Sequence, residues 1–242
     1  MPAVSNKAPP RTVLGLDAAG GSCSAALWHD GAVRARRFEA MMRGQSERLL
    51  PMVEAVMAEA GVGYEALDAI AVTLGPGGFT GVRIGLAAAR GLAVARDLPL
   101  VGVSSFEAVA VAVPAARRHG RVLAVLLDAK REELYVQAFD AALRPLCEAR
   151  ARAPVALDAA LPPGPLLLAG DARARAVEPL RRAGRDVRIA DGSGLADAAH
   201  VVRLAATRPL DEAGRPALPI YLRAPDVTLP GARPGGPPMP AG

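Results

Sequence analysis

One thirteen-residue run constrains this chain more than any other segment: residues 74–86, LGPGGFTGVRIGL. An apolar segment with strand character, residues 69–73, precedes it, and a segment rich in glycine and alanine follows it. Glycine permits positive φ and close backbone approach, and proline fixes φ. The run therefore predicts a strand, a tight loop with a demanding backbone shape, and a helix over 80–96 with a face of small side chains.

Two familiar phosphate-binding motifs can be tested against this spacing. A Walker loop ends in Gly-Lys-Ser/Thr because its lysine reaches the terminal phosphates, whereas the nearest basic residue here is Arg83. A dinucleotide fingerprint needs a third glycine where this chain has Thr80. The spacing excludes both motifs. It favours close helix-to-helix packing as the reason for the glycines, and an anion at the helix N-terminus stays an open alternative.

The composition indicates a globular chain with a moderately basic surface. The chain has 242 residues, a net charge of +5 and 51% hydrophobic residues, and no apolar run approaches the roughly 18 residues of a membrane span. The arginines are dispersed and have no interleaved aromatic residues, so we expect a solvated basic surface, with a tRNA-binding module as the alternative that the charge permits. Two cysteines and a polar start without a signal-like apolar segment indicate a reducing cytoplasm. We expect Cys23 in the core.

The pattern of apolar segments predicts an α/β fold with an internal duplication. Strands are expected at 12–17, 23–28, 32–38, 69–73 and 99–103, and helices at 46–60, 80–96 and about 104–113. In the second half, strands at 121–128, 133–139, about 146–152 and 166–171 repeat the order. We predict a disordered lead at 1–11, a first lobe at 12–114, a second lobe at 115–223 and a disordered Pro/Gly-rich tail at 224–242.

Two aspartates are the main candidates for chemistry. Asp17 and Asp128 each end the first strand of one half, and in actin-like ATPases and sugar kinases such aspartates meet a Mg-nucleotide. The turn after Asp17 has no hydroxyl in its first two positions, and the turn after Asp128 has no glycine. Turn capping is therefore the favoured role, with an ATPase or kinase as the alternative. The three histidines are isolated in sequence, so we expect no metal site.

The two first-lobe helices predict a surface for a protein partner. Apolar residues cover more than half of the circumference of helix 46–60, while a surface helix needs only one apolar stripe. An exposed docking patch is favoured over a doubly covered internal helix pair. The predicted partner-binding residues are Leu49, Leu50, Val53, Val56, Met57, Val82, Ile84, Gly85, Leu86 and Ala89. The signature loop comprises Gly75, Pro76, Gly77, Gly78, Phe79, Thr80 and Gly81.

Residues 75–85 resemble the GPGSFTGxRxG signature of the TsaB family. Further segments agree in order: QSERLLP at 45–51, DAKREELY at 128–135, GD at 170–171 and PIYLR at 219–223. The resemblance extends from about residue 12 to residue 223. Three positions depart from the family pattern: Gly78 replaces the usual serine, Gln45 the usual histidine, and Ala18-Ala19 the usual Thr-Ser.

This resemblance implies an actin-like (ASKHA) fold of two RNase H-like lobes. It also implies a non-catalytic scaffold subunit, without cofactor or metal, that binds the catalytic paralogue TsaD through first-lobe helices. TsaD transfers a threonylcarbamoyl group to the tRNA adenosine beside the anticodon, and the ATPase TsaE joins the assembly. The resemblance further implies a cytoplasmic protein that meets tRNA only through the complex and that can form a homodimer when alone. Members were once labelled glycoproteases, but no protease constellation is present in this sequence.

Overall fold

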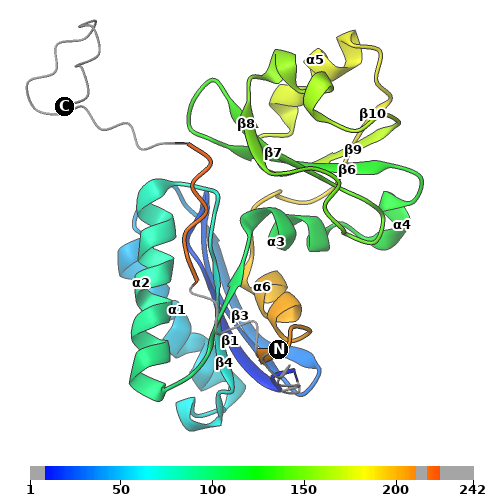
Figure 1. The fold of residues 1–242 in the computed structure, drawn as a ribbon. Helices are drawn as coiled ribbons and strands as arrows, with labels where there is room; N and C mark the ends of the chain where they lie inside the picture. The colour runs from blue at the N-terminus through cyan, green and yellow to red at the C-terminus, as the bar shows by residue number, and fades with distance from the viewer. Residues whose placement is uncertain (1–8, 211–216, 224–242) are drawn as a thin grey trace, which may run out of the picture.

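In this computed structural model, residues 9–210 and 217–223 are described, and they form two lobes, the second above the first in the view of Figure 1. Each lobe is built on a five-stranded mixed sheet. The predicted tail at 224–242 and most of the predicted lead, residues 1–8, lie outside the described residues.

The first sheet has the strand order β3-β2-β1-β4-β5. The strands β1 (Thr12–Asp17), β2 (Ser22–His29) and β3 (Ala32–Ala40) pair antiparallel, while β4 (Ala69–Thr73) and β5 (Leu100–Val103) add in parallel beside β1. Helices α1 (Gln45–Ala60) and α2 (Phe79–Arg96) lie side by side on one face of this sheet, with the short turn η1 (Tyr64–Ala66) between α1 and β4 (Figure 1). These elements agree with those predicted from the sequence to within one or two residues.

The second sheet repeats this plan. Its order is β8-β7-β6-β9-β10 when listed in the same direction as the first sheet. The first three of these strands pair antiparallel, and β9 and β10 add in parallel beside β6, as β4 and β5 do beside β1. The strands are β6 (Val122–Asp128), β7 (Leu134–Phe139), β8 (Arg150–Arg152), β9 (Leu166–Ala169) and β10 (Val187–Ile189). The short turns η2 (Pro154–Ala156) and η3 (Asp158–Ala160) stand where the first lobe has α1, and α5 (Ala174–Arg182) corresponds to α2. The duplicated α/β, actin-like fold is confirmed.

The helix after the last strand of each sheet packs on the other sheet. Helix α3 (Ser105–Ala112) follows β5 of the first sheet but packs on β6 of the second. The short helix α4 (Ala115–Arg118) follows α3 in the chain. Helix α6 (Ala198–Ala205) packs on the first sheet, on the face opposite α1 and α2. A Cβ at Gly15 of β1 would lie 2.4 Å from Val202 Cγ1 of α6, so this close approach requires glycine. The predicted boundary at residue 115 placed α6 in the second lobe, whereas its contacts are with the first.

The first sheet is consequently covered on both faces. Leu14, Leu16 and Val72 pack against α1 and α2, while Val13 and Ala71 pack toward α6. Two-sided burial explains why β1 and β4 read as continuous apolar runs rather than as alternating patterns.

Helix α3 starts with a capping box: the Ser104 hydroxyl accepts the Glu107 N–H at 3.1 Å, and the Glu107 carboxylate accepts the Ser104 N–H at 2.9 Å. The prediction for Cys23 is confirmed: it lies in the core, where burial raises the pKa of its thiol to about 11. Within the described residues, no helix combines the length and apolarity needed to cross a bilayer.

Candidate functional site

The glycine loop packs directly on the turn that follows β1. The Gly78 N–H donates to the Ala19 carbonyl at 2.7 Å. A Cβ at Gly77 would lie 2.0 Å from the Ala19 oxygen, and a Cβ at Gly81 would lie 2.1 Å from the Ala18 oxygen. Real Cβ atoms do not approach oxygens so closely, so both positions require glycine. The predicted helix-to-helix approach is wrong for these two glycines, because the contact is between a loop or helix start and the backbone of a turn.

The same contact fills one side of the N-terminus of α2. The Ala19 carbonyl takes the Gly78 N–H at the helix start, and the Ala18 carbonyl lies beside Gly81. Free N–H groups at a helix start are what attract an anion. Since backbone carbonyls line the sheet-facing side of this helix start, any anion would have to approach from the outer side.

Asp17 is fully buried at the end of β1 and is held by groups of this chain. Its carboxylate accepts the Thr73 hydroxyl at 2.6 Å and the Ala19 N–H at 3.3 Å. The Ser22 hydroxyl lies 3.2 Å from the carboxylate and 3.0 Å from the Ala196 carbonyl. Burial raises the pKa of Asp17, although these hydrogen bonds act in the opposite direction. The Asp17 carboxyl therefore connects β1, β4 and the turn that follows β1.

Replacing Asp17 with asparagine should change how stability depends on pH. The pKa of Asp17 in the folded protein is raised above its ordinary value of 3.8, so the stability that this group contributes is present below pH 3.8 and is lost as the pH rises through the folded pKa. Asparagine keeps an acceptor oxygen for Thr73 and does not titrate. The quantity to follow is the Tm of Asp17→Asn minus the Tm of the unsubstituted chain. We expect this difference to increase as the pH rises above 3.8 and to level off above the pKa of Asp17 in the folded protein. A pH series of thermal melts measures it, and a constant difference would contradict it.

Asp128 has a more open and more cationic setting at the end of β6. Its carboxylate pairs with the Lys130 ammonium at 3.0 Å and the Arg175 guanidinium at 3.5 Å, and it accepts the Lys130 N–H at 2.8 Å. Burial by itself would raise the pKa of Asp128, but the backbone and side-chain hydrogen bonds from Lys130 lower it overall. Among the residues described, no cluster of histidine, cysteine and acidic side chains offers a metal site.

The crevice between the lobes is small. It lies between the glycine loop, at Pro76 and Gly77, and the second-lobe residues Asp128 and Asp171, with a volume of about 20 Å³. A cavity needs roughly 10–15 Å³ to hold one water molecule. A nucleotide does not fit into this crevice, and Asp17 does not line it. The larger hollow of about 510 Å³ that reaches Lys130 is lined by neither Asp17 nor Asp128, which counts against the alternative that these two carboxylates act on a Mg-nucleotide.

The structure buries most of the predicted partner-binding residues. The buried ones, packed against the sheet or between the helices, are Leu49, Val53, Val56, Met57, Val82, Gly85, Leu86 and Ala89. Leu50 is 49% exposed, and Ile84 is half-buried. The wide apolar arc of α1 arises because the helix contacts β2, β3 and α2 at once. As a set of exposed side chains, the predicted docking patch is thus reduced to Leu50 and Ile84.

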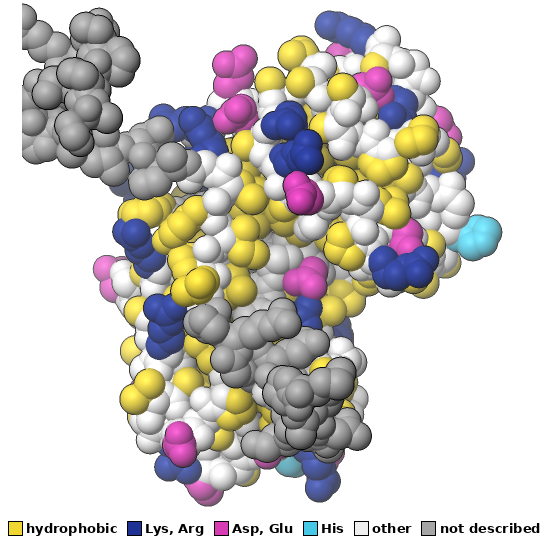
Figure 2. All heavy atoms as spheres, viewed as in Figure 1, with side chains coloured by type: hydrophobic (Ala, Val, Ile, Leu, Met, Phe, Trp, Pro, Cys, Tyr) yellow, Lys and Arg dark blue, Asp and Glu magenta, His cyan; other side chains and the backbone are white. Residues whose placement is uncertain are grey.

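Other apolar side chains accompany these two at the surface. Figure 2 shows hydrophobic side chains gathered over the upper end of α2, interspersed with basic ones. We define the α1–α2 surface by its exposed or half-buried members Met42, Leu50, Phe79, Ile84, Val94 and Tyr221. A hollow of about 510 Å³ opens between the starts of α1 and α2, and Met42, Phe79 and Ile84 are among its lining residues.

An aromatic and basic cluster lies at the start of α2. The rings of Phe79 and Tyr221 have centroids 5.7 Å apart, and the Arg83 guanidinium lies 3.4 Å from the centroid of the Phe79 ring. The Arg83 side chain also donates to the Tyr221 hydroxyl at 3.2 Å. Phe79 was expected in the loop, whereas the sequence predicted no role for Arg83 or Tyr221.

Tyr221 belongs to a strap, residues 217–223, that runs along α2 to the glycine loop (Figure 1). The Arg90 side chain donates to the Ala217 carbonyl at 2.7 Å, and the Ile220 N–H donates to the Leu74 carbonyl at 2.8 Å. Arg223 then pairs with Glu133 of the second lobe at 3.3 Å. The only sequence signal for this strap is the PIYLR segment, whose neighbours in space cannot be inferred from its composition.

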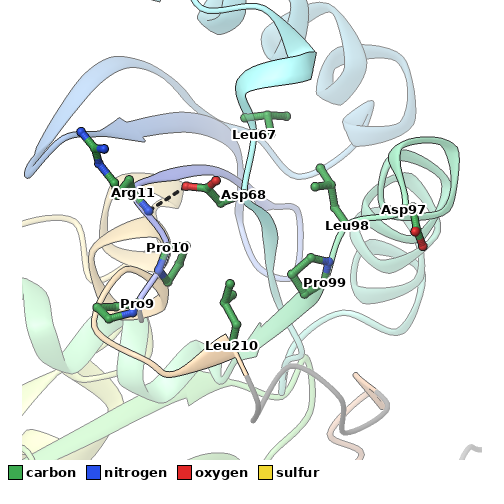
Figure 3. Close-up of a pocket in the computed structure, with 9 residues that line it drawn as sticks. All are labelled: Pro9, Pro10, Arg11, Leu67, Asp68, Asp97, Leu98, Pro99 and Leu210. Carbon is green, nitrogen blue, oxygen red and sulfur yellow. Dashed lines mark hydrogen bonds between the residues drawn. The ribbon is translucent and has the colours of Figure 1, made fainter. Parts of the chain in front are cut away.

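A second hollow lies beside the ends of η1 and α2 (Figure 3). It has a volume of about 520 Å³, and proline and leucine side chains form much of its lining. Its Asp68 carboxylate accepts the N–H groups of Arg11 and Thr12, each at 2.8 Å. This carboxylate anchors the start of β1, and none of the predicted site residues lines the hollow.

The chain is similar to several known proteins. The family model described as "TsaD: tRNA N6-adenosine threonylcarbamoyltransferase" matches residues 39–182. The tRNA threonylcarbamoyladenosine biosynthesis protein TsaB of Escherichia coli is 43% identical over 125 residues, which cover 51% of this chain and 52% of that protein. An uncharacterized protein of Mycobacterium tuberculosis is 33% identical over 89% of this chain and 93% of its own length. The chain belongs to the TsaB family.

Among solved structures, YeaZ from Pseudomonas aeruginosa superposes on this TsaB-family chain with a TM-score of 0.73 and 32% identity. The superposition covers 87% of this chain and 99% of that one. The match to the Escherichia coli protein, by contrast, spans about half of either chain.

The three departures from the TsaB family pattern meet in the structure. Gly78, Gln45 and Ala19 all line the hollow between the starts of α1 and α2. Ala18 and Ala19 also form the turn whose carbonyls contact the glycine loop.

Proposed function

We propose that this chain is a non-catalytic partner subunit in the formation of threonylcarbamoyladenosine in tRNA, and that it binds TsaD through the α1–α2 surface. TsaE joins the assembly, and the tRNA is met through the complex in the cytoplasm. The family membership and the names of the curated relatives support the pathway. The residue ranges 12–114 and 115–223 are proposed as the two lobes by chain position, with α3 and α6 packed across the junction.

The distribution of exposed apolar side chains is the observation that carries the docking proposal. Of the nine large hydrophobic side chains exposed among the described residues, six lie on or beside α1 and α2, counting both from the strap: Met42, Leu50, Phe79, Val94, Leu218 and Tyr221. Scattered exposed hydrophobic residues are ordinary, but a local concentration marks an interaction surface. Tyrosine and arginine, as in the Arg83–Tyr221 pair, are also the residue types that most often dominate binding energy at such surfaces.

The interior of the molecule supports a role without catalysis. Asp17 is engaged by side-chain and backbone donors of this chain, Asp128 is paired with two cations, and the crevice beside Asp128 holds about 20 Å³. An ATPase or kinase would need room for a nucleotide beside these carboxylates, and neither of them lines the larger hollow at Lys130. Calorimetry with Mg-ATP on the isolated chain separates the two functions: tight binding with turnover would overturn the non-catalytic proposal.

Substituting the exposed apolar residues should break the contact with the partner. We expect Leu50→Asp and Ile84→Asp each to raise the dissociation constant for the TsaD of the same organism by about tenfold or more, because truncating a hot-spot residue of an interface costs about 2 kcal/mol or more. Co-purification should weaken accordingly. Dissociation constants from titration calorimetry give the size of the effect.

Val155→Asp is the matched control. Val155 is 85% exposed and lies in the second lobe, far along the chain from α1 and α2. This variant should bind TsaD as the unsubstituted chain does. Normal binding by both first-lobe variants would show that the α1–α2 surface is not the docking site.

A further inference from the structure

The strap is held firmly to the first lobe. Ala217 is only 9% exposed, and its carbonyl accepts the Arg90 side chain at 2.7 Å. The Ile220 N–H donates to the Leu74 carbonyl, beside the glycine loop, at 2.8 Å. Tyr221 then packs on the aromatic and basic cluster at the start of α2. This part of the strap is therefore fixed to α2 and to the glycine loop.

The last two residues of the strap contact the second lobe more weakly. Leu222 is half-buried and packs against a buried cluster to which α3, α6 and the second sheet contribute. Arg223 pairs with Glu133 at 3.3 Å, and the two side chains are 35% and 39% exposed. An ion pair at this exposure contributes little to stability and is screened by salt. The strap is thus tied strongly to one lobe and lightly to the other.

The strap and α6 join the lobes on opposite faces of the first sheet. Helix α6 packs on the face opposite α1 and α2, whereas the strap follows α2 before it reaches Glu133 at the start of β7 (Figure 1). The small crevice between the lobes is lined by Pro76, close to the Leu74 contact of the strap, and by Ala196, just before α6. The crevice therefore lies between the two links, so release of the strap from the second lobe leaves it free to widen.

We propose that the strap is a latch between the lobes: residues 217–221 remain on the first lobe, while the contact of Leu222 and Arg223 with the second lobe opens and closes. With the latch closed, the crevice keeps its volume of about 20 Å³. With the latch open, α3 and α6 connect the lobes and the crevice widens. Because the weakest contact is an exposed ion pair, ionic strength and the charge at Glu133 set how often the latch opens. The proposal goes beyond the proposed function, because it concerns the isolated chain and needs no partner.

A thiol placed in the wall of the crevice measures this opening in the full chain. Ser105 lines the crevice but is only 4% exposed, and its hydroxyl has no hydrogen-bond partner among the described residues, so Ser105→Cys loses no contact. Cys147→Ser is combined with it, because Cys147 is a half-buried free thiol, whereas Cys23 is buried and its raised pKa keeps it unreactive. The rate at which iodoacetamide, a neutral reagent, alkylates position 105 then reports how often the crevice opens, and mass spectrometry follows it.

Charge reversal at the ion pair is the main test. We expect Glu133→Lys and Arg223→Glu each to speed alkylation about two- to fivefold, the size expected for loss of an exposed ion pair. The double variant, which restores opposite charges, should return to the original rate. Glu132→Lys is the matched control and should not change the rate, because Glu132 is exposed in the same loop and the ion pairs between described residues include none with it. Equal rates in all of these chains, or no rescue by the double variant, would overturn the proposal.

Two truncations test the strap as a whole. A chain that ends after residue 216 lacks the strap, and a chain that ends after residue 223 keeps it. We expect alkylation of the shorter chain to be about tenfold faster or more, since it loses the apolar contacts of Leu222 as well as the ion pair. Equal rates in the two chains would contradict the latch; if the shorter chain does not fold, the charge variants decide in its place. None of these measurements involves TsaD, so the latch and the docking proposal fail independently.

Discussion

Replacing Gly81 with alanine is expected to lower the free energy of unfolding by about 2–3 kcal/mol, the upper part of the range for overpacking substitutions. The new Cβ would lie 2.1 Å from the Ala18 carbonyl oxygen. This oxygen belongs to the backbone of the turn after β1, which Asp17 holds in place through the Ala19 N–H. The clash is therefore relieved only by moving α2 or the turn. Urea unfolding followed by circular dichroism measures the change.

The same helix contains two matched controls. A Cβ at Gly91 meets no atom within 4 Å, so Gly91→Ala should raise the free energy of unfolding by about 0.5–1 kcal/mol through helix propensity alone. A Cβ at Gly85 would make an ordinary contact of 3.6 Å with Val72, so Gly85→Ala should be tolerated. Equal effects of alanine at positions 81 and 91 would show that the contact with the turn does not constrain Gly81.

Replacing Val53 with aspartate is expected to leave the chain unfolded at room temperature. Val53 is 1% exposed and packs in the core that α1 forms with the first sheet. An unpaired carboxylate in such a site costs several kcal/mol in addition to the lost apolar contact. Native domains are stable by only about 5–15 kcal/mol. Far-ultraviolet circular dichroism and size-exclusion chromatography detect the loss of the folded state.

Leu50→Asp provides the comparison within the same helix. Leu50 is 49% exposed, so its replacement should leave the Tm within a few degrees of the unsubstituted chain. A folded Val53→Asp protein that fails to bind TsaD would mean that this residue faces the partner after all. A difference in folding between the two variants assigns Val53 to the core and Leu50 to the surface.

The elements could be predicted because their signals are local. The strands at 12–17 and 69–73 stand out as apolar runs, and the helices expected at 46–60 and 80–96 match α1 and α2 to within one residue. The similar order of strands in the two halves pointed to the duplicated sheet. In the second half, only residues 150–152 of the expected third strand at 146–152 form β8.

The site was predicted less completely, because its contacts join distant parts of the chain. Nothing local in the PIYLR segment indicates that Tyr221 lies beside Phe79, or that Arg223 pairs with Glu133. Likewise, the sequence contains no signal that α6 covers the first sheet. Contacts of this kind depend on how the whole chain folds back on itself.

The sequence by itself determined the duplicated α/β fold, the family and the importance of residues 74–86, because periodicity, turn residues and glycine spacing are properties of short segments. Only the tertiary structure decided which apolar side chains are core and which are surface. Burial depends on what covers each face of a helix, and α1 is covered by β2, β3 and α2 together. The structure also decided why Gly77 and Gly81 are glycines, since the oxygens that exclude a Cβ come from a turn about 60 residues earlier in the chain.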